Sequence, residues 1–261
     1  MIGIFDSGAG GLSVFREIRK VLPDQHYIYY SDSAHCPYGD KSRDYITARA
    51  RLITEFLMTK GAEIIVVACN TATAAAIATL RKEYPDIPFI GMEPAVKPAA
   101  SYTKTGIIGV LATEGTLKAD KYIDTKDRFA PDAEVVEHVG EGFVELVEQG
   151  YISGDETERI IKASISPLLD AGADTIVLGC THYPFLSEVI QKVAEDIRPD
   201  CSISIIDPAP AVARHLLDVM KENGIRTDSP EGFKIELHTS GDPDRLKSLY
   251  CRLLPGEAQI Q

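Results

Sequence analysis

Short apolar runs alternate along the chain with stretches in which apolar residues recur at helical spacing. The run at 1–5, for example, is followed by Leu12, Phe15, Ile18 and Leu22, which are three or four residues apart. Such a run predicts a buried strand, and such spacing predicts an amphipathic helix. Strands are predicted at 1–5, 26–30, 64–68, 106–111, 135–138, 175–178, 203–206 and 234–238. Helices are predicted at 12–22, around 52–57, at 71–83, 116–123, 141–150 and 156–171, from 184 onward, and at 213–221 and 242–253. This alternation is typical of an α/β fold in which helices flank a mainly parallel sheet.

Two segments of the first half of the chain recur in the second half. Residues 2–7 (IGIFDS) align with 108–113 (IGVLAT), and residues 61–69 (GAEIIVVAC) align with 172–180 (GADTIVLGC). The second pair shares a Gly-Ala-acid start and a cysteine at the end of the strand, which favours a duplication over a chance likeness of two strands. We therefore predict two similar domains, with a proline-rich crossing at 85–98, and a second proline cluster, Pro208 and Pro210, is predicted to open the helix through 213–221. Because ligands of open α/β sheets bind at the carboxyl ends of strands, domains that face each other would bring the two cysteines to one cleft.

Composition and charge narrow the functional classes. The 261 residues are 44% hydrophobic and 25% charged, which is ordinary for a globular protein. The formal net charge of −12 disfavours binding to nucleic acids or to anionic membranes, since both require basic patches. The start MIGIFDSG lacks the basic region of a signal peptide, and no apolar run reaches membrane-spanning length. Five scattered cysteines without a CxxC pair resemble neither a disulfide scaffold nor a zinc ribbon. We expect a reduced, cytoplasmic protein.

Cys69 and Cys180 are the strongest chemical candidates. Each stands where a buried strand ends and a helix is expected to begin, so that backbone N–H groups there favour a thiolate. Either cysteine alone could be a small buried hydrophobic residue, but the repeated context favours function. Inversion of a stereocentre removes a proton from one face and returns a proton to the other, which one base cannot do on a fixed substrate. Two thiols of similar pKa fit this task in both directions.

Two residues could assist the thiols. Asp6 ends the first strand, at the same sheet edge as Cys69, where it could orient that thiol or bind a substrate ammonium group; the alternative is a turn or N-cap role. His182 follows Cys180 by two residues and could move protons or stabilise its thiolate. The alternatives for His182 are a helix-start residue satisfied by backbone, or half of a metal site with Cys180. The sequence has no further cluster of metal ligands, so no metal is expected.

Three further features are less specific. The polar loop at 31–42 follows a strand and could close over the sheet edge, where Tyr38 and Gly39 could bind a carboxylate through backbone N–H; the alternative is a surface turn. Glu148 lies in a helical stretch, and its pattern alone indicates a solvated acid. The glycine-rich loop at 8–11 does not match GxGxxG, so nucleotide binding is weakly supported.

Taken together, five segments resemble the glutamate racemases, members of the aspartate/glutamate racemase family that act in bacterial cell-wall synthesis. The segments are FDSGAGG (5–11), YSDSAHCPYGDKS (30–42), VACNTATA (67–74), GVLATEGTLKADKY (109–122) and VLGCTHYP (177–184). They cover the first two thirds of the chain in the order usual for the family. The chain departs from the family pattern at Glu145, where proline is usual, and at 207–209, where Asp-Pro-Ala replaces Asp-Ser-Gly.

The resemblance implies a fold and a function. It implies interconversion of L- and D-glutamate without pyridoxal phosphate or any other cofactor, supplying D-glutamate for peptidoglycan. It implies two pseudo-symmetric α/β domains with the active site in the interdomain cleft. The first domain would comprise 1–93 and 208–261, and the second 94–207. A homodimer is expected, with glutamate as the small-molecule partner and with neither nucleic acid nor membrane.

The resemblance also assigns residues by position. Cys69 and Cys180 are the catalytic acid/base pair, with Cys69 taking the proton from D-glutamate and Cys180 from L-glutamate. Asp6 and His182 assist them, and Glu148 is the supporting acid. The implied substrate contacts are Asp6, Ser7, Tyr38, Gly39, Asn70, Thr71, Thr181 and His182.

Three alternatives stay open at this point. An aspartate or broader-specificity amino-acid racemase would use the same machinery, although the THYP segment around His182 favours glutamate. A decarboxylase or isomerase of similar fold would need only one cysteine, whereas this chain has two in matched contexts. A non-enzymatic ligand-binding protein would need no reactive thiol at all.

Overall fold

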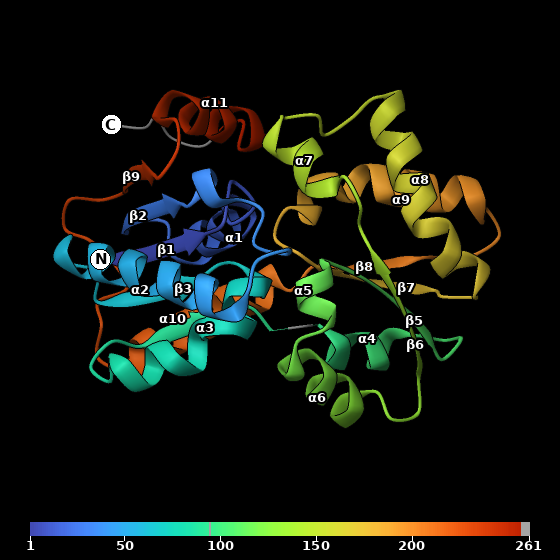
Figure 1. The fold of residues 1–261 in the computed structure, drawn as a ribbon, viewed down its shortest axis with the longest axis horizontal. Coiled ribbons are helices and arrows are strands. Elements are labelled where there is room, and N and C mark those ends of the chain that lie inside the picture. The colour runs from blue at the N-terminus through green and yellow to red at the C-terminus, as the bar shows by residue number, and fades with distance from the viewer. Residues whose placement is uncertain (94, 257–261) are drawn as a thin grey trace. The chain divides into compact units, whose positions relative to one another are not determined.

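A computed structural model describes residues 1–93 and 95–256. The chain forms two compact units, each built on its own parallel sheet (Figure 1). Unit 1 comprises Met1–Met92 and the segment from Ala209 onward, and unit 2 comprises Glu93–Pro208. Pro94, the first residue of the predicted second domain, lies outside the described residues. Among the described residues, no helix has both the length and the apolar character needed to cross a membrane.

Unit 1 contains a five-stranded sheet in the order β4-β3-β1-β2-β9. Its strands are β1 (Ile2–Asp6), β2 (His26–Ser31), β3 (Ile64–Val67), β4 (Phe89–Gly91) and β9 (Lys234–Thr239). Its helices are α1 (Leu12–Val21), α2 (Arg43–Thr59), α3 (Asn70–Glu83), α10 (Ala209–Glu222) and α11 (Pro243–Leu253), with a 3-10 turn η1 (Ser33–His35). All four strand pairs are parallel. Every residue of β1 and β3 is buried, as expected for central strands covered on both faces.

Unit 2 contains a four-stranded sheet in the order β6-β5-β7-β8, again with all pairs parallel. Its strands are β5 (Ile107–Ala112), β6 (Glu134–Val139), β7 (Thr175–Gly179) and β8 (Ser204–Ile206). Its helices are α4 (Val96–Tyr102), α5 (Glu114–Leu117), α6 (Asp120–Phe129), α7 (Phe143–Glu148), α8 (Asp155–Asp170) and α9 (Ser187–Ile197), with a 3-10 turn η2 (Tyr183–Leu186). The predicted α/β class, with two parallel sheets and flanking helices, is therefore confirmed.

The two sheets share one strand arrangement and one register. The order β4-β3-β1-β2 in unit 1 corresponds to β8-β7-β5-β6 in unit 2. Ile2 of β1 pairs with Ile64 of β3, and Ile108 of β5 pairs with Thr175 of β7. These four positions are matched by the two sequence alignments given above. The strands β1 and β5 are matched by one alignment and β3 and β7 by the other, yet the strand pairs have the same register. A duplication explains this agreement.

The two units are also alike in how a helix packs on the sheet, and a glycine stands at the matched position in each. A Cβ added to Gly3 would lie 3.2 Å from Leu57 Cδ1, and one added to Gly109 would lie 3.0 Å from Leu168 Cδ1. Leu57 of α2 and Leu168 of α8 stand in matched positions before the aligned strands β3 and β7. In both units the helix therefore approaches the sheet so closely that a side chain in place of glycine would force the leucine to shift.

The structure refines the element predictions in three places. The boundary between the two units, at Met92 and Glu93, lies within the proline-rich stretch at 85–98 that is predicted as a crossing, and this stretch also contains β4 and the start of α4. The helix predicted at 116–123 is divided into α5 and α6. The helix through 213–221, which Pro208 and Pro210 are predicted to open, begins at Ala209, with Pro210 in its first turn, where proline loses no helical hydrogen bond. Strand β4 was missed because it has only three residues, and its pairing with β3, not local propensity, makes it a strand.

Candidate active site

The carboxyl ends of β1 and β3 bring Asp6 and Cys69 to one edge of the unit 1 sheet. Phe5 pairs with Val67, and the backbone N–H of Ala68 donates to Phe5 O at 2.8 Å. Parallel strands end at the same edge, so the residues that follow them are neighbours across the sheet. Both side chains are buried.

Cys69 is the N-cap residue of α3. Its Sγ accepts a hydrogen bond from the backbone N–H of Ala72 at 3.4 Å and lies 3.9 Å from Ser7 Oγ. The α-helix that starts here has 14 residues, and its N-terminal N–H groups favour negative charge on the sulfur. Cys69 therefore occupies a position that suits a thiolate.

Asp6 caps the glycine-rich loop. Its Oδ2 accepts hydrogen bonds from the backbone N–H groups of Gly8 at 3.1 Å and Gly11 at 3.0 Å. The loop is compact here, because a Cβ added to Gly11 would lie 2.7 Å from Asp6 Cβ and 2.9 Å from Tyr29 Oη. The turn-capping alternative for Asp6 is thus realised in the structure, whatever else the carboxylate does.

Tyr38, from the polar loop, is buried in the same hydrophobic cluster as Cys69. Its hydroxyl donates to Asp32 Oδ2 at 2.5 Å, and Arg49 binds both oxygens of Asp32, with Nε at 2.9 Å and Nη2 at 2.7 Å. Burial acts to raise the pKa of Asp32, but the hydrogen bonds from Arg49, Tyr38 and Ser240 outweigh it and hold the pKa below its usual value. Burial and the adjacent Asp32 raise the pKa of Tyr38 well above its usual value. Asp32 is therefore an anion and Tyr38 a neutral hydroxyl donor at neutral pH.

Asn70 and Thr71 form the first turn of α3 directly after Cys69, and both are buried. Within the described part of the chain, Asn70 Oδ1 has no hydrogen-bond partner. A buried acceptor without a donor costs about 1–3 kcal/mol, so this oxygen is suited to a donor from a ligand. An ammonium group is one such donor.

In unit 2, three predicted residues form a chain of contacts. Cys180 follows β7, and its Sγ lies 3.7 Å from His182 Nδ1. His182 Nε2 lies 2.8 Å from Glu148 Oε1, at the end of α7. His182 is buried and Glu148 is largely buried, so the carboxylate fixes the orientation of the ring. Glu145, where the chain departs from the family pattern, does not displace Glu148 from His182.

Tyr183 positions α7 against the turn that follows Cys180. Its ring packs edge-on against Phe143 with centroids 4.9 Å apart, and its hydroxyl donates to Gly140 O at 3.3 Å. Burial, together with Cys180 nearby, raises the pKa of Tyr183 well above its ordinary value, so it stays a neutral phenol. Sequence reasoning missed this residue, although it lies in the VLGCTHYP segment. Thr181 is buried beside it.

Comparison with known proteins gives the family. The family model described as Asp/Glu/Hydantoin racemase matches residues 2–216. The chain belongs to this racemase family. Among curated relatives, the glutamate racemase of Ectopseudomonas mendocina is 46% identical over 259 residues, covering 99% of this chain and 96% of the relative. That of Roseiflexus sp. is 46% identical over 253 residues, covering 97% and 91%.

Solved structures of family members have the same fold over the whole chain. Glutamate racemase isoform RacE1 of Bacillus anthracis matches with a TM-score of 0.87 and 32% identity, covering 100% of this chain and 96% of that one. The Escherichia coli glutamate racemase, solved with L-glutamate and the activator UDP-MurNAc-ala, matches with a TM-score of 0.84 and 34% identity, covering 97% and 94%. The predictions of family and of enzyme class, an amino-acid racemase among the isomerases, are therefore confirmed.

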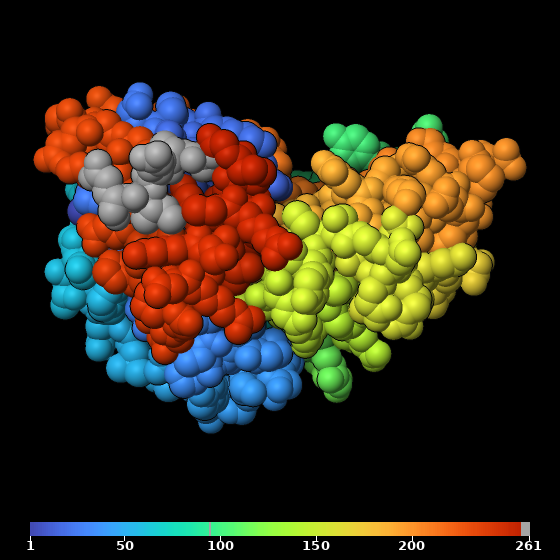
Figure 2. All heavy atoms as spheres, turned by 90° about the horizontal axis from the view of Figure 1, so that it is seen from above, coloured from blue at the N-terminus to red at the C-terminus, as the bar shows by residue number. Residues whose placement is uncertain are grey.

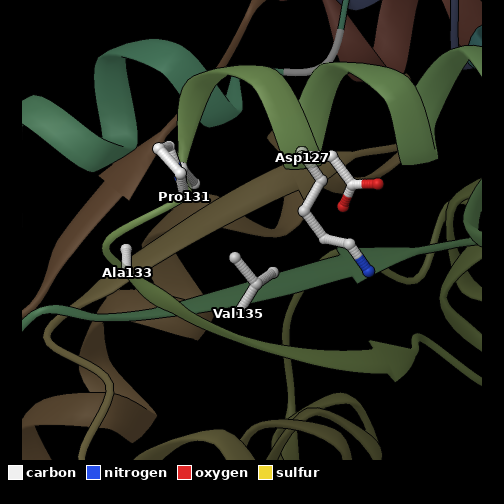
Figure 3. A pocket seen from close by; sticks show the side chains of 6 residues that line it. Asp127, Pro131, Ala133 and Val135 are labelled. Carbon is white, nitrogen blue, oxygen red and sulfur yellow. The ribbon is translucent and has the colours of Figure 1, made fainter.

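Two surface hollows of this racemase lie in unit 2. The larger, of about 430 Å³, lies where the end of α6 and the following turn meet β6, and Figure 3 shows Asp127, Pro131, Ala133 and Val135 around it. The other, of about 300 Å³, lies between α8 and α9. No residue predicted to bind substrate or to act in catalysis lines either hollow. These two hollows therefore do not contribute to the candidate active site.

Proposed function

We propose that this racemase interconverts L- and D-glutamate by a two-cysteine acid/base mechanism. The observation that carries the proposal is the equivalence of Cys69 and Cys180, which follow matched strands of a duplicated fold. A racemase must remove the α-proton from two mirror-image substrates, and two similar units that each carry one thiol suit this task. The relatives that are 46% identical over nearly the full chain and carry the name glutamate racemase support the choice of substrate.

The proposed reaction moves one proton off the α-carbon and another onto it. The Cys69 thiolate takes the α-proton of D-glutamate, forming an S–H bond and leaving the electron pair of the C–H bond on the substrate as a carbanion. The Cys180 thiol then gives its proton to the opposite face, which produces L-glutamate and a Cys180 thiolate. The reverse reaction exchanges the two roles, as microscopic reversibility requires.

The assistants of each thiol differ in this proposal. His182 is held in place by Glu148. When the imidazole of His182 is protonated, its positive charge stabilises the Cys180 thiolate and lies near the substrate, where the reaction requires it. Asp6 shapes the loop beside Cys69 and is proposed to bind the substrate ammonium group. The positive end of α3 stabilises the Cys69 thiolate.

The remaining predicted contacts bind the substrate. We assign this role to Ser7, Tyr38, Gly39, Asn70, Thr71, Thr181 and His182, together with Asp6. Asn70 Oδ1 supports the assignment, because a buried acceptor without a partner in the described chain fits an ammonium donor. The backbone of Tyr38 and Gly39 is proposed to bind a carboxylate.

One experiment tests the substrate and the reaction together. Purified protein is incubated with L-glutamate in deuterium oxide, and both α-deuterium incorporation and D-glutamate are measured over time. We expect both to appear, and to appear at rates unchanged by dialysis against a chelator and by a carbonyl reagent that traps pyridoxal phosphate. Activity that is lost on this treatment and restored by a metal or by pyridoxal phosphate would contradict the cofactor-free proposal.

Substrate preference is tested in the same assay. A site whose polar groups pair with two carboxylates leaves them unpaired when the side chain is uncharged, so glutamate should exceed alanine and glutamine in kcat/KM by about 10²-fold or more. A preference for aspartate would instead support the broader racemase alternative.

The cellular role follows from the product. We propose that the enzyme acts in the cytoplasm as a homodimer and supplies D-glutamate for peptidoglycan. Depletion of the protein in its host should produce cell-shape defects that D-glutamate in the medium relieves. Defects that persist with D-glutamate taken up would contradict this role.

A further inference from the structure

Asp32 is the centre of a buried polar network that no assigned role explains. Its side chain is fully buried, yet it carries a charge that four hydrogen bonds stabilise: two from Arg49, one from Tyr38 and one from Ser240. Burial of an ion is costly unless its hydrogen-bonding capacity is met. A buried carboxylate at this position indicates that it holds neighbouring groups in place.

On one side, this network contacts strand β9 and the residue that follows it. Strand β9 pairs in parallel with β2, so that Thr239 lies beside Ser31. Beyond this pair, Ser33 Oγ lies 2.7 Å from Thr239 Oγ1, and Ala34 N–H donates to Ser240 Oγ at 3.1 Å. Figure 2 shows the red C-terminal segment lying directly beside the blue N-terminal residues of unit 1. The start of the polar loop is therefore fixed by residues about 200 positions later in the sequence.

The other side of the network leads toward Cys69. The backbone N–H of Asp32 donates to Asp6 O at 2.9 Å, which ties the loop to the end of β1. The Tyr38 hydroxyl reaches back from the loop to the Asp32 carboxylate, and its ring packs in the cluster that includes Cys69. The Tyr38 side chain is thus fixed at its hydroxyl by Asp32 and around its ring by the cluster that includes Cys69.

We propose that Asp32 and Arg49 are positioning residues that hold the backbone of Tyr38 and Gly39 ready to bind a carboxylate of the substrate. The proposal rests on the proposed function, because it takes these N–H groups as substrate contacts. A loop fixed before binding loses little conformational entropy when the substrate arrives, so the network contributes to affinity and not to proton transfer. Arg49 binds the Asp32 carboxylate and acts through it in this proposal.

The test compares four variants with the wild type in steady-state kinetics on both glutamate enantiomers. Tyr38→Phe removes the hydroxyl and keeps the ring, Asp32→Asn removes the charge, and Arg49→Gln removes its partner. Each should raise KM by about 10-fold for both enantiomers, which equals ~1.4 kcal/mol of binding free energy, while kcat changes by less than about 3-fold. Arg49→Lys, which keeps the charge but not the two-point contact, should recover part of the affinity.

Arg51→Gln is the matched control. Arg51 lies on the same helix and binds Glu83 through Nε at 2.6 Å and Nη2 at 2.7 Å, but this pair is partly exposed and lies outside the network. Its KM and kcat should match those of the wild type. Circular dichroism and thermal unfolding identify variants that fail to fold, and Tyr38→Phe, the mildest change, carries the test if Asp32→Asn does not fold.

The outcomes separate this inference from the proposed function. Folded variants with wild-type KM would overturn the positioning role and leave glutamate racemisation intact. A fall in kcat at unchanged KM would also overturn it, because the network would then act on the thiol. A wild-type protein inactive on glutamate would overturn the proposed function and this inference with it.

Discussion

Cys69 and Cys180 hold equivalent places in a duplicated fold, but their surroundings differ. After β3 a long α-helix begins at once, and the Cys69 sulfur accepts a hydrogen bond from its first turn. After β7 the chain instead forms the 3-10 turn η2, and the Cys180 sulfur lies beside His182. One thiol is therefore served by a helix terminus and the other by a histidine and a glutamate.

The comparison shows which part of a duplicated unit is retained and which diverges. The strands, their register and the glycines beneath matched leucines are alike in both units, because they form the core. The groups around each sulfur differ, so that each thiol can be tuned separately for the role proposed for it above.

The largest effect is expected from removal of either thiol. Cys69→Ala and Cys180→Ala should each lower racemisation by at least about 10³-fold, because in the proposed mechanism each removes the base on one face. Residual α-deuterium exchange should survive on L-glutamate in Cys69→Ala and on D-glutamate in Cys180→Ala, as followed by NMR in deuterium oxide. The opposite pattern would reverse the assignment of faces. Near-normal racemisation in either variant would defeat the two-base mechanism.

A smaller and one-sided effect is expected from His182→Gln and Glu148→Gln. Each breaks the contact chain at Cys180 only, so abstraction of the proton from L-glutamate should fall by about 10²-fold for His182→Gln and by less for Glu148→Gln. The measurement is the initial deuterium exchange rate of each enantiomer. Glu145→Gln, on the same helix, serves as the control and should exchange both enantiomers normally. An equal loss on both enantiomers would show that the two thiols do not have separate assistants.

Gly3→Ala and Gly109→Ala test the likeness of the cores. Each adds a methyl group that lies 3.0–3.2 Å from a leucine of the covering helix, so each should lower the free energy of unfolding by about 1–3 kcal/mol. Urea unfolding followed by circular dichroism measures both. Gly61→Ala provides a comparison in which positive φ, and not crowding, is the cost. A large cost in one unit and none in the other would contradict matched packing.

The smallest effect is expected from Ser7→Ala. Ser7 Oγ lies 3.9 Å from Cys69 Sγ, a weak contact worth about 1 kcal/mol or less, so exchange on D-glutamate should fall only several-fold. Exchange on L-glutamate should change less. A loss as large as that of Cys69→Ala would mean that Ser7 itself takes part in proton transfer.

Some of the candidate site could be predicted from local sequence and some could not. Cys69 and Cys180 were found because each ends an apolar run, and the register of the matched strands follows from the same alignments. Glu148 could not be found by pattern, since a glutamate at a helix end looks solvated; only the family resemblance indicated it. Its contact with His182 joins residues 34 positions apart.

The sequence by itself determined the alternation of strands and helices, the duplication and the places of the two thiols, because apolar periodicity and the residues at strand ends are local properties. Tertiary structure alone decided that Phe89–Gly91 is a strand, that Lys234–Thr239 pairs with the second strand of the chain, and that Asp32 meets Arg49 and Tyr38. These features depend on which surfaces pack together. A short strand has too few residues to show a period, and a buried carboxylate is stable only where distant parts of the chain supply its donors.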